Sequence, residues 1–227
     1  MIVTARSEFQ TVARASDAAE ALALRDGWLF DSHRAEVMSL LQQVDVALAG
    51  NEQRAVSFLS CGRGAGTTSV AWAYARASAM VFRRRVLLLD AAGRGVNLLQ
   101  PLAAQPGHIP ALTIEPLTSG IWTAAFRDRT PSRDEITTTV ANPEFWGRLR
   151  ENFDEVVVDS PAASESHLGL TIASRVDGVV LLVEAEKTRA PVARRLLDDL
   201  RAVRANVVGS IFNRRRFHVP TRIYGRL

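Results

Sequence analysis

A glycine-rich turn between a short apolar run and a long helical segment is the feature that most limits how this chain can fold. The run AVSFLS ends at Ser60, the turn CGRGAG follows, and TTSVAWAYARASAMVF reads as a largely apolar helix. Glycines let backbone N–H groups turn inward around a phosphate, and the helix N-terminus adds partial positive charge. Strand, loop and helix in immediate succession predict a phosphate-binding loop at Gly62, Gly64 and Gly66; a plain glycine turn is the alternative.

The residue after Gly66 departs from the usual pattern of such loops. The pattern continues with lysine, which reaches the β- and γ-phosphates, and then with serine or threonine, whose hydroxyl holds Mg²⁺. Thr67 stands at the lysine position, whereas Thr68 still supplies the hydroxyl and Ser69 follows it. The backbone cradle can bind phosphate without the lysine, but loss of one cation from a phosphoryl-transfer site is expected to slow turnover about 10³-fold or more.

Two nearby arginines, Arg63 in the loop and Arg94 further along, are candidates to replace the missing charge. The residues expected to bind nucleotide at the loop are Gly62, Arg63, Gly64, Ala65, Gly66, Thr67, Thr68 and Ser69.

Four further apolar runs without polar alternation are predicted as strands covered on both faces. They are RVLLLD, which ends in Asp90, EVVVDS, whose strand ends in Asp159, DGVVLLVEA, and ANVVGSIFN. Helical segments such as PEFWGRLRENF and KTRAPVARRLLDDLRAVR lie between them, so the β-α-β order predicts an α/β fold with a parallel sheet and helices on both faces. Ligands bind such sheets at the carboxyl ends of the strands, where the loop, Asp90 and Asp159 all fall. Between Ala91 and Thr139 only one further strand, around Leu112 to Glu115, is predicted.

A chain of 227 residues is long enough for one sizeable α/β domain. Residues 1–31 are expected to form an N-terminal arm, residues 32–213 the domain, and residues 214–227 a basic tail. The domain is expected to open with an amphipathic helix from Ser32 to Leu48, where apolar residues recur at helical spacing.

Composition points to the cytoplasm. No run reaches the roughly 18 apolar residues of a membrane span, the first residues lack the pattern of an export signal, and the single cysteine, Cys61, cannot form an internal disulfide. The pI near 10.1 reflects an arginine surplus, and the tail after Asn213 is rich in arginine and has little acid. This tail is a candidate contact for an anionic membrane surface or an acidic partner. No recognition motif accompanies the charge, so nucleic acid is not an expected ligand.

Four stretches carry a resemblance to a known family. They are SCGRGAGTTSVAWAYA, RVLLLDAAGRG, FDEVVVDSPAA, and VDGVVLLVEAEKTRAPVARRLLDDLRAVRANVVGSIFN. On them, the chain from Gln53 to Asn213 resembles the bacterial tyrosine autokinases of exopolysaccharide synthesis, relatives of the MinD- and ParA-type positioning ATPases.

The resemblance implies a P-loop NTPase fold of that class, with ATP or ADP and Mg²⁺ as ligands. It implies a metal site at Thr68, Asp90 and Asp159, residual catalytic roles for the two aspartates, and contact of Asn213 with the adenine edge. Whether nucleotide binds, given Thr67, is left open.

Three departures from the family pattern point in one direction. Besides the lost lysine, the second aspartate of the DxD motif is replaced by Ala92, and the terminal tyrosine cluster is reduced to Tyr224. The glutamate and two arginines that build the family's ring correspond to Glu36, Ser39 and Gln42, so a ring of the usual kind is not expected, although another homo-oligomer stays open. Together these losses predict a pseudokinase, catalytically inactive or impaired.

The resemblance also implies a setting. The leading hypothesis is a cytoplasmic regulatory partner, peripheral at the inner membrane, of a polysaccharide copolymerase that acts in export of a capsule, holdfast or other exopolysaccharide. The alternatives are an active ATPase with atypical loop chemistry and a membrane-associated positioning protein.

Overall fold

The computed structural model describes residues 33–93, 112–118, 120–126 and 132–214. The expected N-terminal arm, the tail from 215 onward, Arg94 and Tyr224 lie outside these residues. In the described part, the helices are α3 (Arg34–Ala47), α4 (Thr67–Phe82), α5 (Arg133–Ala141), α6 (Pro143–Asn152), α7 (Leu168–Ala173) and α8 (Ala190–Ala202). The strands are β1 (Arg54–Ser60), β2 (Val86–Asp90), β3 (Leu112–Thr118), β4 (Ile121–Phe126), β5 (Glu155–Asp159), β6 (Gly178–Glu184) and β7 (Val207–Asn213).

These strands form one seven-stranded sheet in the order β3-β4-β2-β5-β1-β6-β7. Five of the six neighbouring pairs are parallel, and only β3 and β4 pair antiparallel. The predicted α/β class with a parallel sheet is therefore confirmed, with one antiparallel edge strand added. Strand β1 lies between β5 and β6 and runs parallel to both, so the loop that follows β1 has the carboxyl end of a strand on each side.

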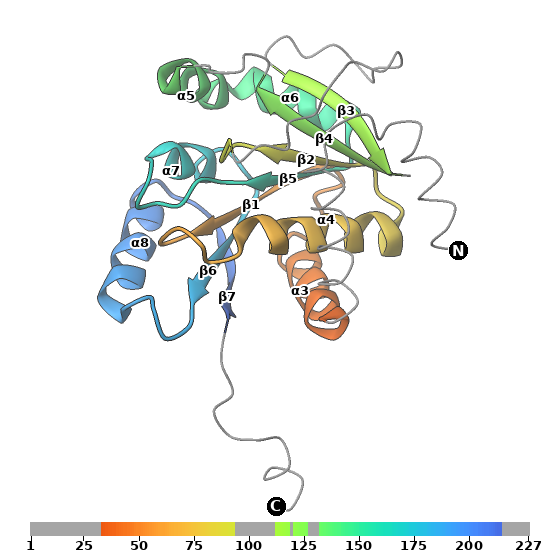
Figure 1. Cartoon of the computed structure of the whole chain (residues 1–227). Coiled ribbons are helices and arrows are strands. Elements are labelled where there is room, and N and C mark those ends of the chain that lie inside the picture. The colour runs from red at the N-terminus through yellow and green to blue at the C-terminus, as the bar shows by residue number, and fades with distance from the viewer. Residues whose placement is uncertain (1–32, 94–111, 119, 127–131, 215–227) are drawn as a thin grey trace, which may run out of the picture.

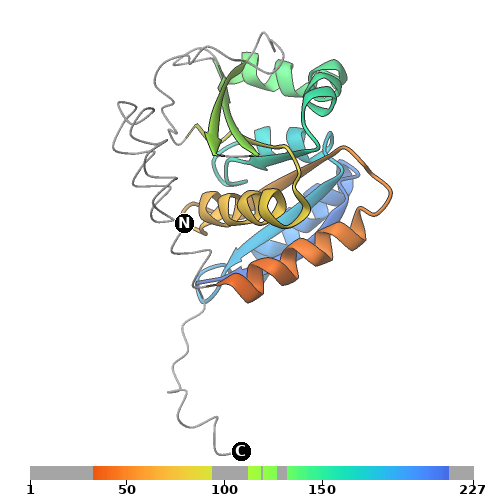
Figure 2. The same cartoon turned by 90° about the vertical axis from the view of Figure 1, so that its right-hand side faces the viewer.

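Helices cover both faces of the sheet, as predicted. Helices α3 and α4 pack side by side on one face, and α5, α6, α7 and α8 cover the other (Figure 1, Figure 2). All seven residues of β1 are buried because alternate side chains face the two helical layers: Val56 and Phe58 pack toward α4, whereas Leu59 packs toward α8. The absence of polar alternation in the strands reflects this double cover.

The region between β2 and β5 differs most from the expectation. A strand was predicted near Leu112 to Glu115, and β3 covers it, but β4 and α5 were missed, as was α7, which follows β5. The connection from Thr118 to Ile121 is too short for a crossover, so β3 and β4 must form a hairpin. Helix α5 was missed because its TTT run has low helix propensity; a capping box between Ser132 and Glu135 stabilises its first turn.

A buried ionic cluster ties the amino ends of β1 and β5 to the helices on one face. The Arg54 guanidinium, 2% exposed, donates to Oε1 of Glu155, which is fully buried, at 2.8 Å. Arg54 and Arg84 both donate to Asp45 of α3, at 3.0 and 2.7 Å. Burial, reinforced by the adjacent Glu155 carboxylate, raises the pKa of Tyr74, whose hydroxyl donates to Glu155. The cluster lies at the end of β1 remote from the glycine loop and holds the expected amphipathic helix, observed as α3, on the sheet.

Candidate functional site

The glycine loop joins β1 to α4 at the carboxyl edge of the sheet, at the left of Figure 1. Gly64 and Gly66 have φ angles of +80° and +87°, in the left-handed region that disfavours any residue with a Cβ. Helix α4 begins directly after Gly66, whose carbonyl accepts a hydrogen bond of 3.0 Å from the Val70 N–H. The first N–H groups of a 16-residue helix therefore follow a turn of glycine geometry, as a phosphate cradle requires.

Thr68 and the two strand-end aspartates lie together beside this loop. The Thr68 hydroxyl donates to Oδ2 of Asp159 at 2.6 Å. Asp90 and Asp159 are register partners at the ends of β2 and β5, and the Ala91 N–H donates to the Asp159 carbonyl at 3.0 Å. The three residues that the resemblance assigns to a metal site are thus neighbours, although no sequence proximity brings them together.

These three side chains fit the ligand chemistry of Mg²⁺. They offer only oxygen donors, and Mg²⁺ is commonly held by one or two carboxylates with further oxygens from phosphate and water. Within the described residues, no group of three or more histidine, cysteine, aspartate or glutamate side chains forms a candidate metal site of another kind. If Mg²⁺ binds, Thr68, Asp90 and Asp159 would hold it, and its charge would offset that of the phosphates.

Thr67, at the lysine position, is 1% exposed. Its hydroxyl oxygen is buried and has no hydrogen-bond partner among the described residues. A buried hydroxyl without a partner is destabilising by roughly 1 to 3 kcal/mol. Thr67 therefore brings no charge to the lysine position, and no hydrogen bond among the described residues compensates for the burial of its hydroxyl.

The contacts of Arg63 do not support its expected role as the cation that replaces the missing lysine. Its guanidinium lies 2.5 Å from Oε1 of Glu165, just before α7, and its side chain is 78% exposed. Arg94, the other candidate cation, lies outside the described residues.

Asn213, at the end of β7, contacts the loop directly. Its side-chain amide donates to the Ala65 carbonyl at 2.7 Å, and a Cβ added to Gly66 would overlap the same amide nitrogen. In this conformation the amide binds the loop, so contact with an adenine edge, which stays a prediction, would use its remaining hydrogen-bonding capacity or require rearrangement.

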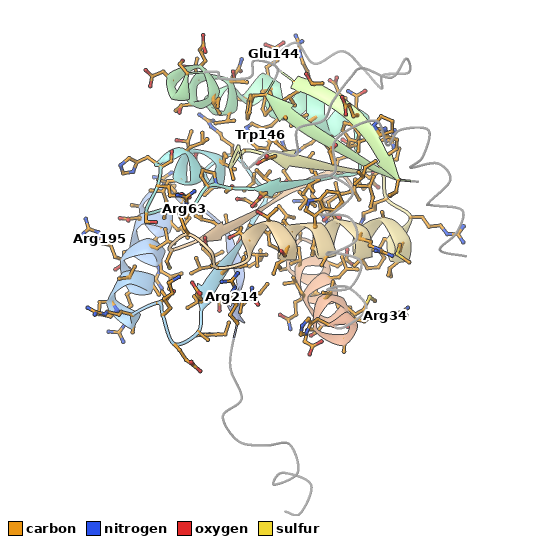
Figure 3. All side chains as sticks on the ribbon, in the orientation of Figure 1. Arg34, Arg63, Glu144, Trp146, Arg195 and Arg214 are labelled. Carbon is orange, nitrogen blue, oxygen red and sulfur yellow. The ribbon has the colours of Figure 1, made fainter. Side chains whose placement is uncertain are left out.

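Arg214 and Glu184 are two site residues that sequence reasoning missed. Arg214 was assigned to the tail, yet its Nη1 lies 3.8 Å from the position that a Cβ on Gly64 would occupy and 3.5 Å from Oε1 of Glu184. Figure 3 shows Arg214 on the β7 side of the loop and Arg63 on the side of α7 and α8. The arginine triplet that follows the last strand was the available signal, because parallel strands bring their carboxyl ends to one edge.

The remaining loop residues have structural contacts. The Ser60 hydroxyl donates to the Gly62 carbonyl at 3.0 Å, and Ala65 is buried. Burial raises the pKa of the Cys61 thiol, which does not favour a reactive thiolate. Ser69 lies in the first turn of α4, half-buried.

The departures from the family pattern also have places in the structure. Ala92 follows Asp90 beyond β2 and brings no carboxylate to the aspartate pair. On α3, Glu36, Ser39 and Gln42 are all exposed. No helix among the described residues has the length and apolar character to cross a bilayer.

Comparison with known proteins supports the fold. No family model matches the chain, and no curated protein matches it in sequence. Among solved structures, the kinase domain of the Escherichia coli tyrosine kinase ETK is similar with a TM-score of 0.67 at 17% identity, over 81% of this chain and 78% of that one. The kinase domain of VpsO is similar with a TM-score of 0.60 at 20% identity, over 82% of this chain and all of that one.

A more distant structural match carries a ligand. The ATP complex of Cyanothece McdA has a TM-score of 0.55 at 16% identity, over 72% of this chain and 71% of that one. The sheet order, the glycine loop at its carboxyl edge and these matches agree: the chain has the P-loop NTPase fold of the bacterial tyrosine kinase domains.

Proposed function

We propose that this chain is a nucleotide-binding relative of the bacterial tyrosine kinases with lost or strongly reduced phosphoryl-transfer activity. One contrast within the site carries the proposal. Thr68 is hydrogen-bonded to Asp159, and Asp90 lies in register with Asp159, an arrangement of oxygen ligands that could hold Mg²⁺. The lysine position beside it holds Thr67, a buried and neutral residue.

The energetics separate binding from turnover. Backbone N–H groups and the α4 dipole can hold phosphate without the lysine, whose charged hydrogen bond is worth roughly 1.5 to 3 kcal/mol. Phosphoryl transfer is more sensitive, because its acceleration comes almost entirely from positioning and from stabilising charge on the transferring group. Loss of the lysine therefore affects turnover more than affinity, and Ala92 in place of a second carboxylate adds to this loss.

Calorimetric titration with ADP and ATP, paired with a sensitive assay of phosphate release, tests the proposal. The expected result is saturable binding with Mg²⁺ and hydrolysis slower by about 10³-fold than that of a lysine-containing relative measured in parallel. Rapid, metal-dependent hydrolysis would refute the loss of activity, and absence of binding would refute the nucleotide site.

The setting of this activity is proposed from the family resemblance. We propose that the chain acts in the cytoplasm at the inner membrane, as a regulatory partner of a polysaccharide copolymerase. Co-purification of the full chain with the copolymerase from the same genome, with and without nucleotide, checks this part. A complex that forms equally with a variant whose loop cannot bind nucleotide would remove the regulatory role of nucleotide.

The alternative of an atypical active ATPase is favoured by the contact of Thr68 with Asp159 and the register of Asp159 with Asp90, which leave oxygen ligands for Mg²⁺. It requires a cation near the transferring phosphate, and Arg63 was the first candidate from the sequence. Because Arg63 pairs with Glu165, Arg63→Ala is expected to leave any measured hydrolysis rate unchanged. A large loss of hydrolysis in that variant would favour this alternative.

A further inference from the structure

Arg214, the residue directly after β7, is a basic residue that the fold brings close to Gly64 of the glycine loop. Its Nη1 lies 3.8 Å from the position of a Cβ on Gly64, and its side chain is 57% exposed. A guanidinium there is close enough to the loop to reach a phosphate seated in it, yet remains open to an incoming ligand.

Hydrogen bonds fix the backbone of Arg214 relative to the loop. Asn213 donates from Nδ2 to the Ala65 carbonyl at 2.7 Å and accepts the Arg214 N–H on Oδ1 at 2.9 Å. Arg214 itself has a φ angle of +60°, a left-handed conformation that disfavours residues other than glycine. Such backbone conformations persist where surrounding contacts impose them, and they concentrate at functional sites.

The charge of Arg214 is only loosely held in this structure. Its contact with Oε1 of Glu184 is 3.5 Å, at the limit of a hydrogen bond. Lys187 lies closer to the same carboxylate, 3.0 Å from Oε2, so Glu184 keeps a cationic partner if Arg214 turns away. Arg63, by contrast, is 2.5 Å from Glu165 on the other side of the loop.

We infer that Arg214 binds the phosphates of a nucleoside di- or triphosphate held in the glycine loop, and so supplies, from just after β7, a cation in place of the one that Thr67 does not provide. A guanidinium presents a planar fork that matches phosphate oxygens in pairs, which suits this role. The inference rests on the proposed function, because it requires that the loop hold a nucleotide.

Calorimetric titration of the full chain with ADP, ATP and adenosine tests the inference in the wild type, Arg214→Ala and Arg214→Lys. Arg214→Ala is expected to weaken ADP and ATP binding about tenfold or more, with adenosine binding unchanged. Arg214→Lys is expected to recover part of the loss, since it restores charge but not the paired geometry. The matched control is Arg195→Ala, an exposed arginine of α8 that lies apart from Arg214 in Figure 3 and should leave all affinities unchanged.

A second variant tests the same idea without removing the arginine. Glu184→Gln removes the competing carboxylate, so it is expected to tighten ADP binding several-fold while Arg214 is present and to have no such effect in the Arg214→Ala background. This comparison also covers the case in which Arg214→Ala folds poorly, because Glu184→Gln alone must still tighten binding.

The outcomes separate this inference from the proposed function. If wild-type protein binds none of the nucleotides, both fail. If wild-type protein binds ADP and Arg214→Ala binds it equally well, the proposed function stands and the inference is overturned. A loss of affinity in Arg214→Ala that is as large for adenosine as for ADP would also overturn it, since the arginine would then not act on phosphate.

Discussion

The Thr68 hydroxyl donates a 2.6 Å hydrogen bond to Oδ2 of Asp159, a residue 91 positions further along the chain. The bond connects the first turn of α4 to the carboxyl end of β5 and sets the hydroxyl and the carboxylate side by side. A cation bound by the same two oxygens competes with this hydrogen bond. We therefore expect Thr68 and Asp159 to determine how strongly nucleotide binding depends on the metal ion.

Removal of the Thr68 hydroxyl should therefore abolish the effect of Mg²⁺ on the affinity for ADP. In Thr68→Ala, the affinity for ADP with Mg²⁺ is expected to fall about tenfold, to the value that the wild type has in EDTA, because one ligand oxygen is lost. Calorimetry in Mg²⁺ and in EDTA measures this. Thr171→Ala, on α7, serves as the control and should keep the wild-type response to Mg²⁺; full metal dependence in Thr68→Ala would contradict the assignment.

Restoring the lysine is a gain-of-function test. Thr67→Lys is expected to tighten ADP binding by roughly 10-fold to 150-fold, the equivalent of one charged hydrogen bond, and to raise any hydrolysis rate. The isosteric Thr67→Val is the control for the change in packing. It removes a buried hydroxyl without a partner among the described residues, so its free energy of unfolding should be equal to or above that of the wild type. A folded Thr67→Lys protein with unchanged affinity would show that the position does not face the phosphates.

The conformation of Gly66 predicts a strong effect of a single methyl group. Gly66→Ala places a Cβ at a φ angle of +87° and against the Asn213 amide, so it should lower the free energy of unfolding by about 1 to 2 kcal/mol and abolish nucleotide binding. Urea unfolding and calorimetry report the two effects.

Gly147→Ala is the matched control for that glycine. Gly147 lies on the exposed side of α6 with nothing within 4 Å of an added Cβ, so this variant should gain about 0.5 to 1 kcal/mol of stability. If Gly66→Ala behaved like Gly147→Ala, the left-handed geometry of the loop would be wrong.

The buried ion pair of Arg54 with Glu155 should matter for folding and not for the ligand. Arg54→Met leaves a fully buried carboxylate without its 2.8 Å partner, and such a change typically lowers the free energy of unfolding by about 3 to 5 kcal/mol. At a temperature where the variant is folded, its nucleotide affinity should match the wild type, since the pair lies at the far end of β1. A large loss of affinity in the folded variant would contradict this separation.

Acid should destabilise the protein partly through Asp154. The Arg85 guanidinium, which donates to this carboxylate at 2.9 Å, holds the Asp154 pKa below its usual value of 3.8, and the Arg85 N–H adds a hydrogen bond of 2.7 Å. Because the folded pKa is the lower one, the stabilisation is complete above the unfolded pKa and is lost as the pH falls through the folded pKa. In urea unfolding at pH values from 7 to 3, the free energy of unfolding should fall less steeply with falling pH in Asp154→Asn than in the wild type. Asp198→Asn removes an ion pair with Arg201 in which both side chains are exposed, so the pH dependence of its free energy of unfolding should match that of the wild type.

Local pattern was sufficient for much of the fold and for the loop. The strands β1, β2, β5, β6 and β7 were all predicted, since runs such as VLLLD have no polar alternation and strands buried on both faces need none. The loop and the position of Thr67 were also readable, because each depends on residues adjacent in the chain. Helix α5 was missed because its residues have a weak helix preference and a capping box fixes its start. Strand β4 was missed although Ile121, Trp122, Thr123 and Phe126 are residue types enriched in strands.

By itself, the sequence determined the strand-loop-helix unit, the order of the parallel strands along the chain, and the absence of a lysine from the loop. Tertiary structure alone decided that Asp90 lies in register with Asp159, that Arg54 meets Glu155 across 101 positions, and that Arg214 lies beside Gly64. The physical reason is that periodicity and turn chemistry act over a few neighbouring residues. Contacts across the edge of a sheet depend on strand order and register, which the burial of the whole core selects.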